Sequence, residues 1–198
     1  MNETARAVRF PSVATPQRHW KLSADQYQRM GEVGILHEDD RVELLGGELY
    51  EMLPIGKWHN GKVNRLNRRL DRNVGERAIV QAQGSFRLSA DTEPEPDILV
   101  LRFRSDFYES APAGPEDVLL LIEVADTSLA YDRDVKLPLY ARAGIPEVWI
   151  VNRDAARIEV YREPHGGVYR SVTMVERGGS VTPLAFPDLT IPVSDILG

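Results

Sequence analysis

The chain has 198 residues, of which 42% are hydrophobic and 27% charged, and its formal net charge is −6. This length suits one domain with a substantial core, and the composition is typical of a globular protein rather than a disordered one. The absence of cysteine excludes disulfides and thiolate-bound metal sites, and the acidic total charge argues against a surface that coats nucleic acid non-specifically.

Residues 1–20 form the first distinct segment. They include Pro11 and Pro16, which interrupt regular structure, and they lack the apolar core of a secretory signal. No apolar run in the chain approaches the ~18 residues that span a bilayer. We therefore expect a flexible arm at 1–20 and a single domain at 21–198, in a cytoplasmic protein without a membrane segment.

Two short patterns predict the elements that follow the arm. Ser23 and Gln26 have the spacing of a capping box, which predicts a short helix over Ala24–Met30 that Gly31 ends. Gly46 and Gly47 separate two strand-like runs, which predicts a β-hairpin over residues 41–52.

The clearest helical pattern covers residues 61–74. Four apolar side chains recur there at helical spacing: Val63, Leu66, Leu70 and Val74. A basic stripe adjoins this apolar face and consists of Lys62, Arg65, Arg69 and Arg72. The stripe is expected either to contact a nucleic-acid backbone or to be an ordinary solvated helix face. His59 lies just before the predicted helix, where it could contact phosphate, assist proton transfer or serve a structural role.

Short apolar runs dominate the rest of the chain. They predict strands at Ala78–Gln83, Ser85–Leu88, Asp97–Leu101, Val118–Val124, Glu147–Val151, Arg157–Tyr161 and Val172–Val175. A helix within Asp132–Ala143, which Pro138 either delays or bends, separates two of these strands. The order strand, helix, strand over residues 118–151 predicts a parallel strand pair, and therefore an α/β fold with a mixed sheet.

Two carboxylates lie in or beside apolar strands, where an unpaired acid is costly. Asp97 follows Pro96 at the start of one strand, and Glu123 lies near the end of another, VLLLIEV. Acids on neighbouring strand ends could jointly hold Mg²⁺ or Mn²⁺, which lowers the pKa of bound water and polarises a phosphodiester. In the structural alternative, Asp97 caps a turn. Glu123 then pairs with Arg133 or Arg142.

The order Pro96-Asp97, then Glu123, then a lysine resembles the PD-(D/E)XK nuclease signature. A longer stretch, LLIEVADTSLAYDRDVKLPLYARAGIPEVWIVN, is similar to the Uma family of bacterial restriction endonucleases. The matching positions are Glu123-Val124, Thr127-Ser128, Asp132-Arg133, Lys136, Tyr140 and the run from Gly144 to Trp149. Further matches at Arg41–Gly47, Pro54–His59 and the closing FPDLTIPVSDIL extend the resemblance over most of residues 20–197.

This resemblance implies a restriction-endonuclease-like fold, with a central mixed sheet flanked by helices and preceded by a β-hairpin. It implies that Asp97 and Glu123 bind Mg²⁺ or Mn²⁺ and that Lys136 completes the catalytic group. The lysine departs from the plain motif, which would place it two residues after the acid, where this chain has Ala125. Further candidate members of the site are Glu43, His59, Tyr140 and the backbone carbonyl of Val124.

Several of these assignments have a structural alternative. Lys136 stands four residues after Asp132 and could form a helical ion pair with it, and helix-face lysines are usually solvated. Glu43 could be an exposed strand residue, and Tyr140 could fill the core instead of covering the site. Trp149 is expected in the core.

Three functions remain open on the sequence alone. The leading hypothesis is metal-dependent hydrolysis of nucleic-acid phosphodiester bonds, with DNA as the expected substrate. A homodimer is compatible with it, because cutting both strands needs two centres. The alternative is a non-catalytic member of the same fold that binds nucleic acid or a protein through the basic helix. An enzyme for a small phosphorylated metabolite would fit the acidic charge, but the chain has no glycine-rich phosphate loop.

Overall fold

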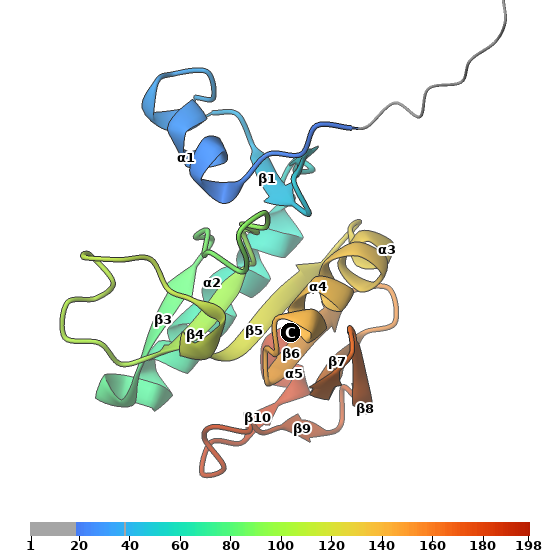
Figure 1. The fold of residues 1–198 in the computed structure, drawn as a ribbon. Coiled ribbons are helices and arrows are strands. Elements are labelled where there is room, and N and C mark those ends of the chain that lie inside the picture. Colours follow the sequence, from blue (N-terminus) through green and yellow to red (C-terminus); the bar gives the residue numbers. More distant parts are fainter. Residues whose placement is uncertain (1–18, 38) are drawn as a thin grey trace, which may run out of the picture.

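A six-stranded mixed sheet lies at the centre of the computed structural model, which describes residues 19–37 and 39–198 (Figure 1). Its strands stand in the order β3 (Ala78–Ala82), β4 (Ile98–Arg102), β5 (Val118–Ala125), β6 (Glu147–Asn152), β7 (Arg157–His165) and β8 (Val168–Glu176). Neighbouring strands are antiparallel except β5 and β6, which are parallel. The predicted mixed sheet and its parallel pair are therefore confirmed. The predicted arm at 1–20 falls almost wholly outside the described residues.

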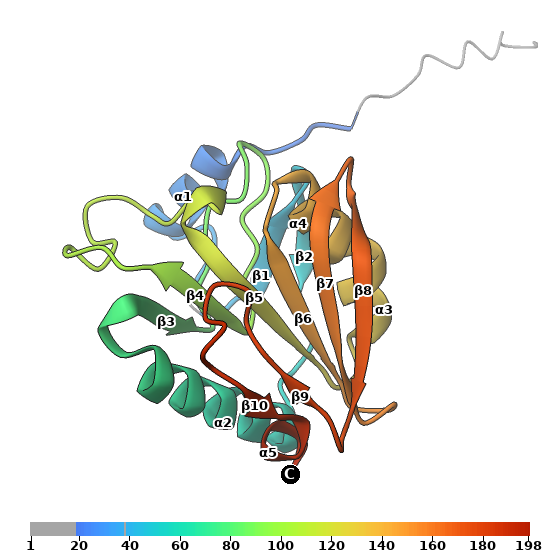
Figure 2. The same ribbon diagram turned by 90° about the horizontal axis from the view of Figure 1, so that it is seen from below.

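Helices cover both faces of this sheet. One face packs against α2 (Lys57–Val74) and α5 (Val193–Leu197), which lie side by side (Figure 2). The other face packs against α4 (Leu137–Arg142), which continues a helical segment made of α3 (Leu129–Tyr131) and η3 (Asp132–Lys136). Alternate residues of each strand enter the two cores, as the two-residue period of a strand requires. Trp149 of β6 is fully buried, as predicted.

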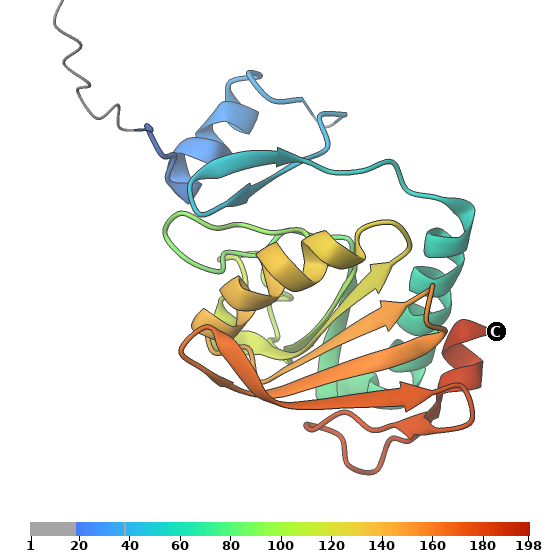
Figure 3. The same ribbon diagram turned by 90° about the vertical axis from the view of Figure 1, so that its right-hand side faces the viewer.

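The N-terminal part adds a helix and a hairpin to one end of the sheet. Helix α1 (Ala24–Glu32) begins with the predicted capping box. Strands β1 (Val42–Leu45) and β2 (Glu48–Glu51) form the predicted hairpin, and Gly46 and Gly47 have φ of 57° and 84°, which favours glycine in this two-residue turn. The chain then crosses the end of the sheet to reach α2 (Figure 3).

The strand predicted at Ser85–Leu88 is absent, and β3 pairs with β4 instead. Residues 85–88 lie beside Thr92–Pro94, with backbone bonds from Phe86 to Pro94 and from Leu88 to Thr92. A ladder cannot continue there, because the facing segment contains prolines that have no N–H to donate. Phe86 and Leu88 of this segment are nevertheless both buried.

Helix α2 and strands β7 (Arg157–His165) and β8 extend beyond their predicted bounds. Helix α2 starts at Lys57, so His59 lies in its first turn rather than before it. The interior glycine Gly61 weakened the helical pattern there, while packing of Trp58 against the core supports the helix. Strand β8 has nine residues rather than four, because its turn at 166–167 extends the pairing with β7.

Strands β9 (Ser180–Val181) and β10 (Ile191–Pro192) form a small separate pair. No helix among residues 19–37 and 39–198 is long and apolar enough to cross a membrane.

The helix predicted within Asp132–Ala143 begins earlier, at Leu129, so the delayed start is wrong, and a π-helical turn at η3 precedes Pro138. The N–H of Leu137 donates to the carbonyl of Asp132, five residues back, and Pro138, which has no N–H, follows at once. One additional residue in a turn rotates the side chains after it by about 100° relative to an α-helix. This local geometry accompanies the inward position of Lys136, which is buried.

Candidate functional site

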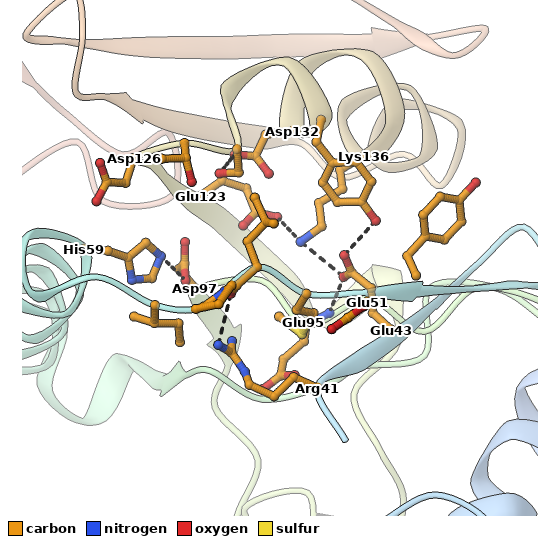
Figure 4. Close-up of a pocket in the computed structure, with 18 of the residues that line it drawn as sticks. Arg41, Glu43, Glu51, His59, Glu95, Asp97, Glu123, Asp126, Asp132 and Lys136 are labelled. Atoms are coloured by element: carbon orange, nitrogen blue, oxygen red, sulfur yellow. Dashed lines mark hydrogen bonds and ion pairs between the residues drawn. The ribbon is translucent and has the colours of Figure 1, made fainter. Parts of the chain in front are cut away.

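A cavity of about 710 Å³ opens at the end of β5, between the sheet, the hairpin and α3 (Figure 4). Its floor is formed by ends of sheet strands and by η3, and its opposite wall by β2 and the segment 52–56. Carboxylates dominate the polar lining: Glu43, Glu51, Glu95, Asp97, Glu123, Asp126 and Asp132. The cationic side chains among the described lining residues are those of Arg41 and Lys136, and His59 lines the cavity as well.

Asp97 and Glu123 are brought together by strand register. Ile98 of β4 lies opposite Ile122 of β5, so one further step along this antiparallel pair places Asp97 opposite Glu123. Directly opposed residues in such a pair have Cβ atoms about 5 Å apart and point to the same face. The two acids therefore lie side by side at the floor of the cavity, on neighbouring strand ends as the sequence predicted.

Asp97 is held by a strand and by a helix. Its Oδ2 accepts the N–H of Val124 at 2.7 Å, and its Oδ1 lies 2.9 Å from Nε2 of His59. The proposed turn-capping role of Asp97 is therefore wrong, because its backbone partner belongs to β5. The carbonyl of Val124 points to the same side as its N–H, as in any extended strand, and thus toward Asp97. Nδ1 of His59 is buried without a hydrogen-bond partner in the described part of the chain.

Glu123 is only 3% exposed and is bound through one of its oxygens. Its Oε1 accepts from the Tyr140 hydroxyl at 2.6 Å and from the Lys136 amine at 3.3 Å. Burial raises the pKa of Glu123 well above its usual value, against the opposing effect of the Lys136 charge. Glu123 forms its ion pair with Lys136, whereas Arg133 pairs with Glu159, so the predicted pairing of Glu123 with Arg133 or Arg142 is wrong. Tyr140 fills the core with its buried ring and also contacts the site, because its hydroxyl donates to Glu123.

Lys136 lies between two acids rather than in solvent. Its Nζ is 3.2 Å from Glu43 and 3.3 Å from Glu123, and the residue is 4% exposed. The suggested ion pair with Asp132 does not form: Lys136 pairs with Glu43 and Glu123, and the Asp132 carboxylate accepts from the Ser128 hydroxyl at 2.7 Å. Burial opposes the charged form of Lys136, but the carboxylates of Glu123 and Glu43 outweigh this effect and raise its pKa. Lys136 is therefore an ammonium at neutral pH.

Glu43 joins the hairpin to this cluster. It is 2% exposed, which rules out the exposed strand position that was its alternative. Besides Lys136, it accepts from the Tyr131 hydroxyl at 2.9 Å and from the Glu95 N–H at 3.1 Å. Glu95 and Tyr131 were not predicted as members of the site. Glu95 stands two residues before Asp97, and this strand-like spacing was the available indication.

Asp132 is a further buried acid at this site. Burial raises its pKa to about 6, against the opposing effects of the Lys136 charge and the Ser128 hydrogen bond. The cavity thus concentrates acids that are difficult to ionise together. A divalent cation would relieve this repulsion, and carboxylate oxygens are the ligands that Mg²⁺ and Mn²⁺ prefer.

The donor chemistry fits such a cation, although its ligands are few. Within residues 19–37 and 39–198, no three acidic or histidine side chains are spaced to surround a metal. Mg²⁺ commonly binds through one or two carboxylates and completes its shell with water and phosphate oxygens. Asp97 and Oε2 of Glu123, together with the Val124 carbonyl, would suffice for that mode of binding.

The basic stripe of α2 has a structural role at three of its four positions. Lys62 donates to the carbonyl of Leu197, Arg65 to that of Asp195, and Arg69 pairs with the Asp195 carboxylate. These contacts attach α5 to α2. Arg72 makes no ion pair with the residues that the structure describes. Nucleic-acid binding by this stripe stays a prediction.

A charge reversal separates the two roles of Arg69. Arg69→Glu is expected to lower the free energy of unfolding by about 1 kcal/mol, because it replaces a half-exposed ion pair by repulsion from Asp195. Urea unfolding monitored by tryptophan fluorescence measures this change, and Arg72→Glu provides the control that leaves stability within about 0.5 kcal/mol. A loss of DNA affinity at unchanged stability would instead favour the nucleic-acid role.

Comparisons with known proteins agree on one family and one fold. The sequence model of the family Uma2, described as "Putative restriction endonuclease", matches residues 24–194. A solved structure from Anabaena variabilis, described as a putative nuclease belonging to DUF820, superposes with a TM-score of 0.70 at 17% identity. The superposition covers 89% of this chain and 97% of that chain. No curated protein matches the sequence.

Proposed function

The chain belongs to the Uma2 family of putative restriction endonucleases, and we propose that it hydrolyses phosphodiester bonds of DNA with bound Mg²⁺ or Mn²⁺. One observation carries the proposal. Asp97 and Glu123 lie side by side in an accessible cavity, and the Lys136 ammonium stands 3.3 Å from Glu123. The two acids supply negative charge for a metal ion, and the lysine supplies positive charge for a phosphodiester.

Each residue has a distinct role in this proposal. Asp97 and Glu123 hold the cation, and His59 keeps the Asp97 carboxylate in place from α2. When bound, Mg²⁺ or Mn²⁺ supplies a water of lowered pKa and polarises the phosphodiester. Tyr140 fixes Oε1 of Glu123 and so directs its other oxygen toward the cavity. Tyr140 and His59 are positioning residues, because they act through the two acids.

Lys136 acts as a fixed positive charge rather than as a proton acceptor. Its Nζ lies 3.2 Å from Glu43 and 3.3 Å from Glu123, and these carboxylates raise the pKa of Lys136, which favours the ammonium form. Its ammonium instead stabilises the negative charge that develops on the phosphate. Glu43 holds Lys136 from the opposite side, which limits its freedom to leave the site.

Metal removal gives the first test of this function. The purified protein is expected to cleave a plasmid or a labelled oligonucleotide in Mg²⁺ or Mn²⁺, and EDTA is expected to reduce cleavage to background because the proposed nucleophile depends on the cation. Titration calorimetry with Mn²⁺ measures metal binding separately from hydrolysis. Cleavage that continues in EDTA would refute metal dependence, and an RNA oligonucleotide of the same sequence tests the choice of DNA.

The non-catalytic alternative receives less support from the structure. It depended on the basic stripe of α2, and three of those side chains bind α5. Mn²⁺ binding without hydrolysis of any nucleic acid would nevertheless favour it over the proposed reaction. A homodimer stays a prediction, and sedimentation velocity measures it directly.

A further inference from the structure

The cavity has an aromatic and apolar lining in addition to its acids. It is contributed by Tyr50 and Met52 of the hairpin region and by Leu53 and Ile55 in the segment that leads to α2. Tyr50 is the residue paired with Glu43 across the hairpin, so its ring stands next to the acidic cluster. The ring centres of Tyr50 and Tyr131 are 5.8 Å apart, which gives the cavity an aromatic corner.

The size of the cavity restricts what can enter it. About 710 Å³ lies within the range of pockets that enclose a small organic ligand, and it suits one or two nucleotides. The acids at its floor are recessed, since Glu123 is 3% exposed and the Asp97 side chain 14%. A single strand is narrower and more flexible than a duplex, so its backbone can enter such a recess more readily.

The charges around the cavity also disfavour an intact duplex. A duplex carries two rows of phosphates and is held mainly by basic surfaces that neutralise them. Here the cavity is lined by an excess of acids, with Arg41 and Lys136 as the lining cations in the described part of the chain. The basic stripe of α2 is largely engaged by α5. Two cations are too few to neutralise the two rows of phosphates that a duplex carries.

From these features we propose that the substrate enters the cavity as an unpaired strand, with one base stacked on Tyr50 and the adjoining phosphodiester at Asp97 and Glu123. The inference rests on the proposed function for its assignment of the phosphate position. Stacking on aromatic rings tolerates any base, so the site would bind single strands with little sequence preference. A single centre suffices for such a substrate, and activity does not require a dimer.

A binding experiment tests this proposal without relying on hydrolysis. A fluorescein-labelled oligonucleotide is titrated by anisotropy in Ca²⁺, which also binds carboxylates, as a single strand and as a blunt duplex. The single strand should bind at least about tenfold more tightly. Tyr50→Ala should weaken single-strand binding by about tenfold, because stacking on one ring commonly contributes that much or more. Tyr50→Phe should retain the affinity, since it keeps the ring.

A remote aromatic residue provides the matched control. Phe107 is 64% exposed in the loop that follows β4, beyond the end of that strand opposite to Asp97. Phe107→Ala should leave single-strand affinity unchanged. Equal or tighter binding of the duplex would overturn the inference, as would an unaltered affinity of Tyr50→Ala. Tight single-strand binding without any cleavage would contradict the proposed function while leaving this inference in place.

Discussion

Replacing Asp97 with asparagine is expected to lower the rate of metal-dependent cleavage by about 10³-fold or more, equivalent to about 4 kcal/mol of transition-state stabilisation. The substitution removes a charge that would hold the cation and keeps the size of the side chain. Its amide oxygen can still accept the Val124 N–H, so β4 and β5 should remain paired. The measurement is kcat on a labelled oligonucleotide, with circular dichroism to verify the fold.

A second carboxylate at the same end of the sheet supplies the control. Asp126 also lines the cavity, but it pairs with Arg153 and is not one of the proposed metal ligands. Asp126→Asn is expected to keep kcat within about threefold of the parent value, in contrast with the effect at Asp97. If the two variants lose activity equally, the cavity needs negative charge in general, and the assignment of Asp97 as a ligand is wrong. Retained activity in Asp97→Asn would refute that assignment as well.

Lys136→Met is expected to lower the free energy of unfolding by about 3 kcal/mol or more at pH 8. It removes the ammonium from between Glu43 and Glu123, and a buried charge without its partner is strongly destabilising. Urea unfolding measures the loss. Lys62→Met, which removes an amine from the more exposed contact with Leu197, should cost about 1 kcal/mol or less.

The loss of stability in Lys136→Met should grow as the pH rises. Burial already raises the pKa of Glu123 in the folded protein, and loss of the Lys136 charge raises it further. A carboxyl group whose folded pKa exceeds its unfolded pKa disfavours folding increasingly as pH rises between the two values. The cost of Lys136→Met should therefore be smaller at pH 5 than at pH 8. Adding Glu123→Gln should restore part of the stability at pH 8, and no recovery would show that the ion pair is not the cause.

The sequence predicted the two acids for a physical reason that the structure retains. Asp97 and Glu123 stood out because acids in apolar strands need a partner, and antiparallel register then placed them opposite one another. Lys136 could not be identified in this way. Its local context fitted a solvated helix or an ion pair with Asp132 equally well, and only the family pattern indicated its place in the site.

The features that were missed depend on contacts between distant parts of the chain. The basic side chains of α2 have partners about 130 residues later in α5, and no local sequence pattern predicts that contact. The strand expected at Ser85–Leu88 does not form because the segment beside it contains Pro94, which has no N–H to donate. Glu95 and Tyr131 joined the site through Glu43, which itself arrives from the hairpin.

The position of Lys136 on a π-helical turn separates the lysine from the strand that carries Glu123. In the plain motif, the acid and the lysine share one strand, so they can be separated only if the sheet is disrupted. Here the segment from Leu129 to Arg142 could unfold locally while the six strands stay paired, because local openings need less free energy than global unfolding. Activity would then depend on the opening equilibrium of one short helix, which makes this segment a natural point of thermal inactivation below the melting temperature of the domain.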